Sequence, residues 1–447
     1  MIYIAIPIYS DPFLHPLHKN NKLSLLYIRE IHGNDVDNWD SSKSYILPQK
    51  HPDSNQYMVD YSFLMDDKQI VMTPDAKKLL PILPEYRCIF DVNIGHWWLH
   101  GKPLDLEVRN NAMDFLSNKY YNVKKLNEII PISKHKEYCD EVSNKILEWA
   151  KKDLNPLIDD EGWFENSGAL DKIKAFYNIE KNGVKVSNDV CDIFDVRVKK
   201  HISNGKLYSN YNLTTTTGRP SNAFGTVNFA ALPPEKRKSI IPENDYLVEF
   251  DFDAYHLRII AFLVGYHTFD KNSVHEHLAK WYECSYEESK QKSFKLLYGG
   301  IDKQTREKVP FFDLTHKLIN DKWNEINQNK YILTDIYRRR IVLENYDDLN
   351  KNKLFNYLIQ AIETELNVKK ILLLQEYLYN KKTKLVLYGY DSFLFDFSKN
   401  DGVETLKEIK KILEVKTDVP GDTEAYFYTK SKMGLNYGEM QDITKRL

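Results

Sequence analysis

Three things are scarce in this sequence of 447 residues: cysteine, long apolar runs and an excess of charge of one sign. Cys88, Cys139, Cys191 and Cys284 lie far apart, without CxxC or Cys/His spacing. Neither a disulfide framework nor a zinc site is expected, and we predict reduced thiols in the core. No run of about eighteen apolar residues occurs and the apolar start lacks a basic leader. We therefore expect a soluble, cytoplasmic protein without a membrane partner.

The charges nearly cancel, with 62 Lys and Arg against 64 Asp and Glu and a formal net charge of −2. Total charge therefore neither supports nor excludes binding to nucleic acid, and any basic surface must be local. With 42% hydrophobic residues the chain is globular. The length prior gives about three domains.

A buried strand followed by an apolar helix is predicted around Asp251. Residues Tyr246–Phe250 are typical of the strand, and Asp251 and Asp253 fall where it ends. Leu257 to Leu263 then recur at helical spacing. A carboxylate at such a corner suits a metal ligand, although an Asp there is commonly only a turn or helix cap. The stretch resembles motif A of the family A DNA polymerases, the bacterial DNA polymerase I kind, with His256 in place of the motif's Glu.

The segment from Lys206 to Pro233 resembles a second motif of this family, Thr-Gly-Arg-x-Ser followed by Asn-Leu-Gln-Asn-Ile-Pro. The matching residues are Thr217, Gly218, Arg219, Ser221, Asn228 and Pro233. A Gly beside an Arg lets backbone and guanidinium approach a phosphate or base edge closely. The resemblance implies that Thr217, Arg219 and Asn228 hold the primer-template. Alone, the segment is typical of a Thr/Gly/Ser loop with one surface Arg.

A helix over Tyr286–Tyr298 is predicted by the capping box in Ser285–Glu288 and by two closing glycines. Lys290, Phe294 and Tyr298 follow at i+4 steps along one face of it. Such a pattern is also typical of a basic helix with a buried aromatic stripe. It matches motif B of the family, which implies that the Lys ammonium binds the dNTP triphosphate and that the rings contact base and sugar.

Two positions near this helix carry further expectations. His275 resembles the family's phosphate-contacting His, although a lone His is commonly structural. The Arg that opens motif B in the family is Tyr286 here, so that charge must come from elsewhere. Lys292 and Lys295 are the candidates.

Asn356 and Gln360 lie four apart in a helix predicted around Leu354–Leu378. They match the family's Asn-x-x-x-Gln, which implies contact with acceptor atoms in the DNA minor groove. Two solvent-facing amides would give the same pattern.

Asp391 falls at the tip of a hairpin predicted over Lys384–Phe397. An Asp in a turn is usually conformational. This one resembles the Asp of motif C, with Tyr390 and Ser392 in place of the neighbouring His and Glu. An amphipathic helix, whose expected apolar stripe is Val403, Leu406, Ile409 and Leu413, is followed by a strand, and the two resemble the end of the family's palm.

Residues 1–130 alternate short strand-like runs with polar turns, which predicts an α/β domain. Strands are expected at Met1–Ile8, Leu23–Ile31, Gln69–Met72 and Cys88–Ile94. The segment from Ile70 to Leu99 resembles the second half of a 3′–5′ exonuclease domain. The first strand lacks the Asp-x-Glu that opens the metal-binding cluster of such enzymes. We expect an exonuclease-like domain without its catalytic acids; the alternative is an unrelated structural domain.

The resemblance implies a mixed α/β and α+β multidomain chain with the right-hand arrangement of polymerases. Residues 131–205 would form a helical linker and a reduced thumb, since helical periodicity runs from Lys136 to about Asn182. The palm, with an antiparallel sheet, would comprise residues 206–265 and 351–447. Residues 266–350 would form helical fingers.

The function implied is that of a template-directed DNA polymerase that adds dNTPs to a primer by two-metal nucleotidyl transfer, without proofreading. Asp251 and Asp391 would hold two Mg²⁺ ions, or Mn²⁺, with help from the Phe252 carbonyl. Lys290 would neutralise the triphosphate or act as an acid. Asp253 is a spare carboxylate on the same strand face.

Sugar selectivity is left open by His256. The family's Glu packs under the sugar and excludes the 2′-hydroxyl, whereas an imidazole can also donate a hydrogen bond to it. Two alternatives follow: a ribonucleotide-tolerant polymerase, and a catalytically silent, polymerase-derived nucleic-acid-binding protein. Substitutions at His256, Tyr286, Tyr390 and Ser392 favour the silent protein, and retention of the metal ligands opposes it.

Brevity of the fingers and thumb suggests a phage or mobile-element enzyme of DNA replication. Such an enzyme would work in the host-cell cytoplasm with a processivity factor or other replisome proteins.

Overall fold

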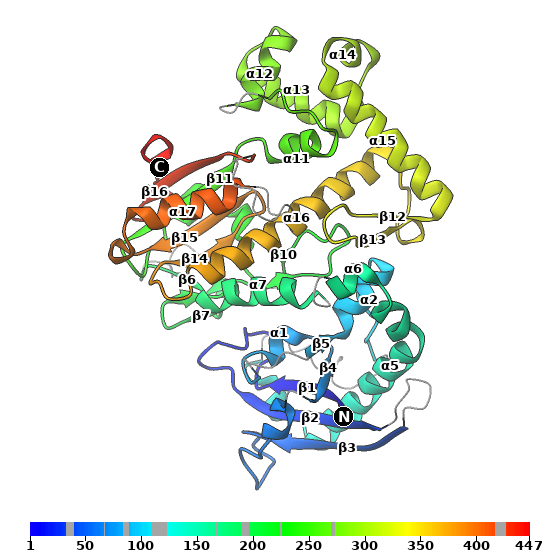
Figure 1. Cartoon of the computed structure of the whole chain (residues 1–447). Coiled ribbons are helices and arrows are strands. Elements are labelled where there is room, and N and C mark those ends of the chain that lie inside the picture. Colours follow the sequence, from blue (N-terminus) through cyan, green and yellow to red (C-terminus); the bar gives the residue numbers. More distant parts are fainter. Residues whose placement is uncertain are drawn as a thin grey trace. The chain divides into compact units, whose positions relative to one another are not determined.

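The computed structural model describes residues 1–32, 40–66, 68–83, 89–108, 123–165, 169–188, 196–223, 226–269, 273–415 and 426–447 (Figure 1). The chain divides into two compact units. Unit 1 comprises Met1–Thr214 and Asn222–Val227, and unit 2 comprises Thr215–Ser221 and Asn228–Leu447. Within the described residues, no helix has the length and apolar character that a membrane crossing requires.

Unit 1 contains a five-stranded sheet with the order β3-β2-β1-β4-β5. The first three strands pair antiparallel, whereas β4 and β5 continue parallel to β1. The strands are β1 (Ile2–Tyr9), β2 (Leu23–His32), β3 (Asp40–Pro48), β4 (Ile70–Thr73) and β5 (Ile89–Asp91). The mixture of strands and helices confirms the expected α/β character.

Two strand predictions in unit 1 need correction. The run DSSKSYILP of β3 was missed because its first half is polar and carries no alternating apolar pattern. The strand expected over Cys88–Ile94 ends at Asp91, since the Asp91 side chain accepts a hydrogen bond from Ile94 N–H and caps the next helix. Cys88 and Cys191 lie outside the described residues.

The helices of unit 1 follow the predicted periodicity. The longest of them within the described residues, α5 (Ile132–Ile158), buries Val142, Ile146 and Trp149. Cys139 is a free, buried thiol on this helix. The other helices are α1 (Ala76–Leu79), α2 (Val92–His100), α4 (Leu126–Ile129), α6 (Glu161–Glu165), α7 (Leu170–Asn182), α9 (Val196–Lys199) and the 3₁₀ turn η2 (Ser62–Met65). Short strands follow at β6 (Val184–Lys185), β7 (Ile202–Ser203), β8 (Lys206–Leu207), β9 (Tyr211–Asn212) and β10 (Ser221–Asn222).

Unit 2 is built on an antiparallel sheet with the order β14-β15-β11-β16-β17. Its central strand, β11 (Tyr246–Phe252), is mostly buried: Val248, Phe250 and Phe252 make one face apolar, and Leu247 and Glu249 on the other face are buried as well. The others are β14 (Lys384–Tyr388), β15 (Ser392–Phe397), β16 (Thr429–Gly434) and β17 (Gln441–Asp442). The predicted hairpin with Asp391 at its tip is confirmed.

One long helix, α16 (Lys351–Tyr377), organises the rest of unit 2. It packs against α11 (Tyr255–Leu263), α13 (Tyr286–Gly299), α15 (Pro310–Asn329) and α17 (Val403–Glu414) (Figure 1). The remaining elements are α10 (Pro234–Arg237), α12 (Val274–Tyr282), α14 (Lys303–Lys308), β12 (Tyr331–Leu333), β13 (Arg340–Val342), η4 (Phe229–Ala231), η5 (Leu343–Asn345), η6 (Lys399–Asp401) and η7 (Thr444–Arg446).

The helices predicted around motif B and around Asn356 are confirmed. Ser285 and Glu288 form the full capping box at the start of α13, and Gly300 follows its last residue. The expectation of core cysteines is wrong for Cys284, which is only half-buried in the turn after α12. Arg339 in this unit is 1% exposed, and its side chain donates a hydrogen bond to the Thr217 carbonyl.

Candidate active site

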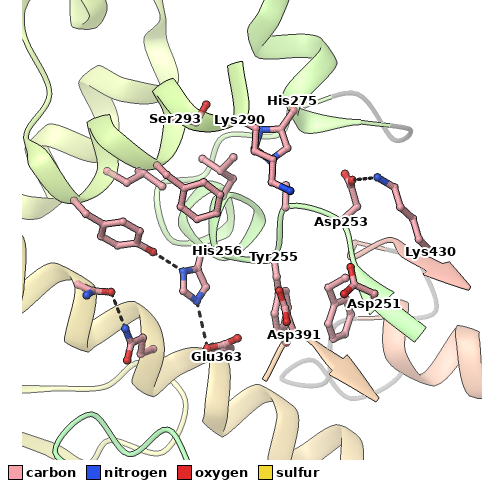
Figure 2. A pocket seen from close by; sticks show the side chains of 18 of the residues that line it. Asp251, Asp253, Tyr255, His256, His275, Lys290, Ser293, Glu363, Asp391 and Lys430 are labelled. Carbon is pink, nitrogen blue, oxygen red and sulfur yellow. Dashed lines mark hydrogen bonds and ion pairs between the residues drawn. The ribbon is translucent and has the colours of Figure 1, made fainter. Parts of the chain in front are cut away.

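A cavity of about 400 Å³ in unit 2 gathers most of the residues that the motifs single out. It lies where β11, α11, α12, α13, α16, the β14–β15 turn and β16 converge (Figure 2). Its lining comprises Arg219, Asp251, Phe252, Asp253, Ala254, Tyr255, His256, Leu257, His275, Tyr286, Lys290, Ser293, Phe294, Leu297, Tyr298, Asn356, Gln360, Glu363, Asp391 and Lys430. Thr217 and Asn228 are not among them.

Two carboxylates from different motifs face the cavity. Asp251 sits near the end of β11, paired in register with Ser392 on β15, and Asp391 directly precedes Ser392. The Phe252 N–H donates a 2.9 Å hydrogen bond to the Asp391 carbonyl, which fixes the turn against the strand. The sheet register therefore brings together residues that are 140 positions apart in sequence.

Left-handed backbone marks both of these corners. Ala254, which begins α11, has a φ of 52°, and Tyr390 has a φ of 73°. Each such conformation costs a non-glycine residue on the order of 1 kcal/mol and persists where the surrounding structure enforces it. The strain therefore lies beside each carboxylate of the pair.

The electrostatics of the pair favour a cation. Burial, and then the nearby charges of Asp391 and Glu249, raises the pKa of Asp251 to about 7. Burial, and then Glu363, raises the pKa of Asp391. Two neighbouring carboxylates in a partly desolvated site repel each other, and a divalent cation with oxygen ligands would relieve that repulsion. The donor set fits the Mg²⁺ expected from the motifs.

One face of α13 forms the opposite wall. Phe294 and Tyr298 lie with ring centroids 6.3 Å apart, and 46% of Phe294 is exposed. Lys290 is exposed one turn earlier on the same face. The His275 ring is buried beside them, 5.8 Å from the Tyr286 ring, and its burial lowers its pKa. The face can thus offer a cation and stacked rings to a ligand in the cavity.

His256 is held at both ring nitrogens. Its Nδ1 bonds the Tyr298 hydroxyl, and its Nε2 lies 3.2 Å from Glu363 Oε2 (Figure 2). Glu363 is fully buried and also pairs with Arg219, whose Nε is 3.0 Å away. Burial alone would raise the pKa of Glu363, but His256 and Arg219 outweigh it and hold that pKa below its ordinary value. These four residues form one network, named here the His256 network.

Sequence reasoning missed Glu363 and Lys430. Glu363 lies three positions after Gln360 on α16, close to a second acid, Glu365, and nothing in this pattern distinguishes it as a site residue. Lys430 on β16 pairs at 3.0 Å with Asp253, and Asp253 also lies 3.5 Å from Arg258. Asp253, the expected spare carboxylate, thus already carries two ion pairs.

Three of the five residues expected to hold the primer-template line the cavity: Arg219, Asn356 and Gln360. Arg219 reaches the cavity, but its guanidinium pairs with Glu363 and stacks on the Tyr390 ring, 4.0 Å from the centroid. Asn356 and Gln360 both line the cavity and bond each other at 2.9 Å.

The other two primer-template candidates have local roles. The Thr217 hydroxyl accepts a hydrogen bond from Arg219 N–H, and its carbonyl accepts one from Arg339. Asn228 caps η4 by accepting from Ala231 N–H, and its side chain is exposed.

Of the comparisons with known proteins, only the one with solved structures found a match. No protein-family model matches the sequence, and no curated protein matches it. Among solved structures, the chain is similar to one described as the POL domain of Pol1 from M. smegmatis in complex with DNA primer-template and dNTP. The TM-score is 0.61 at 12% identity, and the match covers 98% of this chain and 95% of that one. The chain therefore has the fold of this POL domain, as the resemblance to family A DNA polymerases predicts.

Proposed function

We propose that the chain is a template-directed DNA polymerase that adds dNTPs to the 3′ end of a primer. The observation that carries the proposal is the juxtaposition of Asp251 and Asp391 at one wall of the cavity with Lys290, Phe294 and Tyr298 at another. The sequence predicted this set from motifs spread over 140 residues. The likeness in fold to a POL domain solved with primer-template and dNTP supports it.

Asp251 and Asp391 would hold two Mg²⁺ ions, or Mn²⁺, with the Phe252 carbonyl as a further ligand. When bound, such ions lower the pKa of the attacking hydroxyl and neutralise the leaving pyrophosphate. The two carboxylates position the primer end through that site. The Lys290 ammonium balances triphosphate charge or donates a proton to the leaving group, and the Phe294 and Tyr298 rings set the place of the base.

His256 would act in the choice of sugar. Both of its nitrogens already have partners, Tyr298 and Glu363, so a ribose 2′-hydroxyl meets the ring without a free donor. A ribose 2′-hydroxyl that contacts the His256 ring without a hydrogen-bond partner is disfavoured, because it clashes with a fixed side chain and loses its hydration. This arrangement favours dNTPs over rNTPs. The alternative, a ribonucleotide-tolerant polymerase, is distinguished by the primer-extension test below.

Lys430 would supply the charge lost with the Tyr286 substitution. Its ammonium lies 6.0 Å from the Tyr286 ring centroid and lines the cavity beside Asp253. Lys292, a candidate on sequence grounds, instead lies over the Tyr282 ring at 4.4 Å. A cation at the wall of the cavity is what triphosphate binding requires.

For the N-terminal domain, residues 1–130, we propose an exonuclease-like fold without cleavage activity. Pro7 and Tyr9 occupy β1 where such enzymes begin their acid cluster. Asp11, further along, accepts a 2.9 Å hydrogen bond from Phe13 N–H. The remaining divisions are proposed as before: linker and thumb in 131–205, palm in 206–265 and 351–447, and fingers in 266–350. A phage or mobile-element origin, and a processivity partner, stay hypotheses.

Primer extension tests the proposal. The purified chain, Mg²⁺ and a primed DNA template are offered dNTPs or rNTPs separately, beside Asp391→Ala and a matched control, Asp442→Asn, which changes an exposed acid on the same sheet. Extension with dNTPs that Asp391→Ala abolishes and Asp442→Asn preserves is the expected result.

Two other outcomes discriminate between the alternatives. Comparable extension with rNTPs would assign His256 a permissive role. No extension, with primer-template still bound in a fluorescence anisotropy assay, would leave the silent nucleic-acid-binding protein.

A further inference from the structure

Two histidines and an aspartate meet between α2 and α5, within unit 1. The ligand atoms of His96, His100 and Asp153 all lie within 4.8 Å of one another. Asp153 Oδ2 is 3.1 Å from His100 Nε2 and 3.7 Å from His96 Nδ1. Tetrahedral Zn²⁺ takes N and O ligands at about 2.0–2.2 Å, which separates neighbouring ligand atoms by roughly 3.3 Å. The two distances from Asp153 are close to this value, and the two imidazole nitrogens lie within 4.8 Å of each other.

The fold builds the cluster from local rules. His96 and His100 are four apart on α2, so both project from one face. A Cβ added at Gly95 would meet Leu157 Cδ2 at 2.9 Å, so the glycine lets α2 approach α5 closely. Asp153 lies one turn before Leu157 on α5 and therefore faces the same helix.

The charge of Asp153 lacks a permanent counterion. Its carboxylate is buried, and among the described residues only the two imidazoles lie within ion-pair distance of it. His96 Nδ1 is buried and has no hydrogen-bond partner within the described part of the chain. Buried carboxylates are normally paired or coordinate a metal.

We propose that His96, His100 and Asp153 bind one divalent transition-metal ion of the Zn²⁺ class, with water as the fourth ligand. Neutral imidazoles with one carboxylate suit Zn²⁺ and its neighbours, whereas Mg²⁺ prefers oxygen ligands alone. The ion would tie α2 to α5 and is independent of the ions proposed at Asp251 and Asp391. The absence of cysteine spacing concealed this site from sequence reasoning, because its third ligand is 53 residues from the second.

Nearby lysines limit the affinity. The positive charges of Lys102 and Lys152 act on His96 and oppose the binding of a metal cation there. We therefore expect weaker binding than at all-cysteine structural sites.

The test is titration of the chelator-treated full chain with Co²⁺ and Zn²⁺. An Asp251→Asn background removes ions at the proposed polymerase site. Co²⁺ is followed by its visible absorption, which is intense in tetrahedral sites, and Zn²⁺ by calorimetry. The variants are His100→Ala and Asp153→Asn. The matched control is His32→Ala, which removes an exposed His that lies 3.6 Å from Glu30 and belongs to no three-ligand cluster of the described residues.

One equivalent of tetrahedral Co²⁺ is expected in the parent and in His32→Ala. Loss of an outer-shell partner costs metal sites about 10–100-fold in affinity, so loss of a ligand should cost at least that. Unchanged affinity in His100→Ala and Asp153→Asn, or no binding by the parent, would overturn the proposal.

A further variant guards against misfolding as the cause of lost binding. His100→Cys keeps a ligand atom and should add a thiolate-to-cobalt charge-transfer band in the near ultraviolet. A folded His100→Cys protein, by circular dichroism, that lacks this band would contradict coordination at position 100.

Discussion

The two units each contain a cavity with acidic residues, and the acids are used in opposite ways. In unit 2, Asp251 and Asp391 face the same cavity, and the charge of Asp391 contributes to the raised pKa of Asp251. In unit 1, a cavity of about 350 Å³ at the end of β1 is lined by Asp11 and Asp75. Asp11 binds backbone N–H groups, and Asp75 lies 3.6 Å from Lys78 Nζ.

A cation site and a structural acid differ in how the charge of the carboxylate is balanced. A carboxylate that accepts backbone hydrogen bonds or pairs with a Lys already has its charge balanced. Two carboxylates that share a partly buried wall do not, and a metal is the ordinary remedy. On this contrast rests our proposal of metal-dependent chemistry in unit 2 and of a cavity without cleavage activity in unit 1.

The strongest test of this contrast between the two cavities is to remove one acid from each. Asp391→Asn should lower the primer-extension rate by on the order of 10³-fold, the scale of charge-stabilising groups in phosphoryl transfer. Asp11→Asn should leave that rate within about twofold, because its carboxylate only accepts hydrogen bonds from the backbone N–H groups of Phe13 and Lys125 within unit 1. Single-turnover extension measures both.

The same two variants also test the cavity of unit 1. The parent chain should degrade no 3′ end of single-stranded DNA with Mg²⁺ or Mn²⁺. Degradation that Asp11→Asn abolishes would show that the acids of unit 1 are catalytic and would reverse the contrast.

Sequence patterns predicted the parts of the site that depend on local rules. The strand ending near Asp251, the capped helix of α13 and the hairpin around Asp391 each follow from residues within one element. Their order along the chain then pointed to one fold, which the structural likeness confirms.

Long-range contacts were beyond such patterns. Glu363 meets His256 across 107 residues, and Lys430 meets Asp253 only because β16 pairs with β11. Burial was also misjudged, as at Val403, which begins α17 and is 51% exposed although its spacing put it on the apolar stripe. Tertiary packing, not periodicity, decides these positions.

The His256 network allows a second test, this time of a balanced charge inside unit 2. Glu363→Gln removes the buried carboxylate that joins His256 and Arg219, and leaves Arg219 without its counterion. Breaking a buried pair in this way costs about 3 kcal/mol in unfolding free energy. Urea denaturation measures it, with Glu404→Gln, whose side chain is 76% exposed, as the matched control.

The Glu363→Gln variant should also discriminate less well between dNTPs and rNTPs, because His256 loses one of its two anchors. Unchanged stability together with unchanged discrimination would show that the network does not organise the site.

A pH experiment probes the cavity of unit 1 through His135, which lines it and is 1% exposed. Burial lowers its pKa to about 4 despite the hydrogen bond to the Asn127 carbonyl. In the unfolded chain this His takes up a proton near pH 6.5. Its contribution to the free energy of unfolding is therefore fully present above that pH and is lost as the pH falls from about 6.5 to 4. From pH 7 to pH 5 this His should account for about 2 kcal/mol of lost stability.

The comparison needed is between the parent and His135→Gln, which keeps a donor but does not titrate. The variant should lose less stability over the same pH interval by about that amount. Parallel losses in the two proteins would mean that other groups carry the acid sensitivity of unit 1.

The smallest expected effect concerns Asp91, another acid of unit 1 that binds backbone. One oxygen accepts a 3.0 Å hydrogen bond from Ile94 N–H and so caps α2, and the other accepts a 2.8 Å bond from Ala76 N–H at the start of α1. Asp91→Ala leaves both donors unsatisfied and should cost about 1–2 kcal/mol, whereas Asp91→Asn keeps one acceptor and should cost about half as much. Because α2 carries His96 and His100, the alanine variant should also weaken the proposed metal site, and equal stability of all three proteins would show that α2 is held by its packing on α5 and not by its cap.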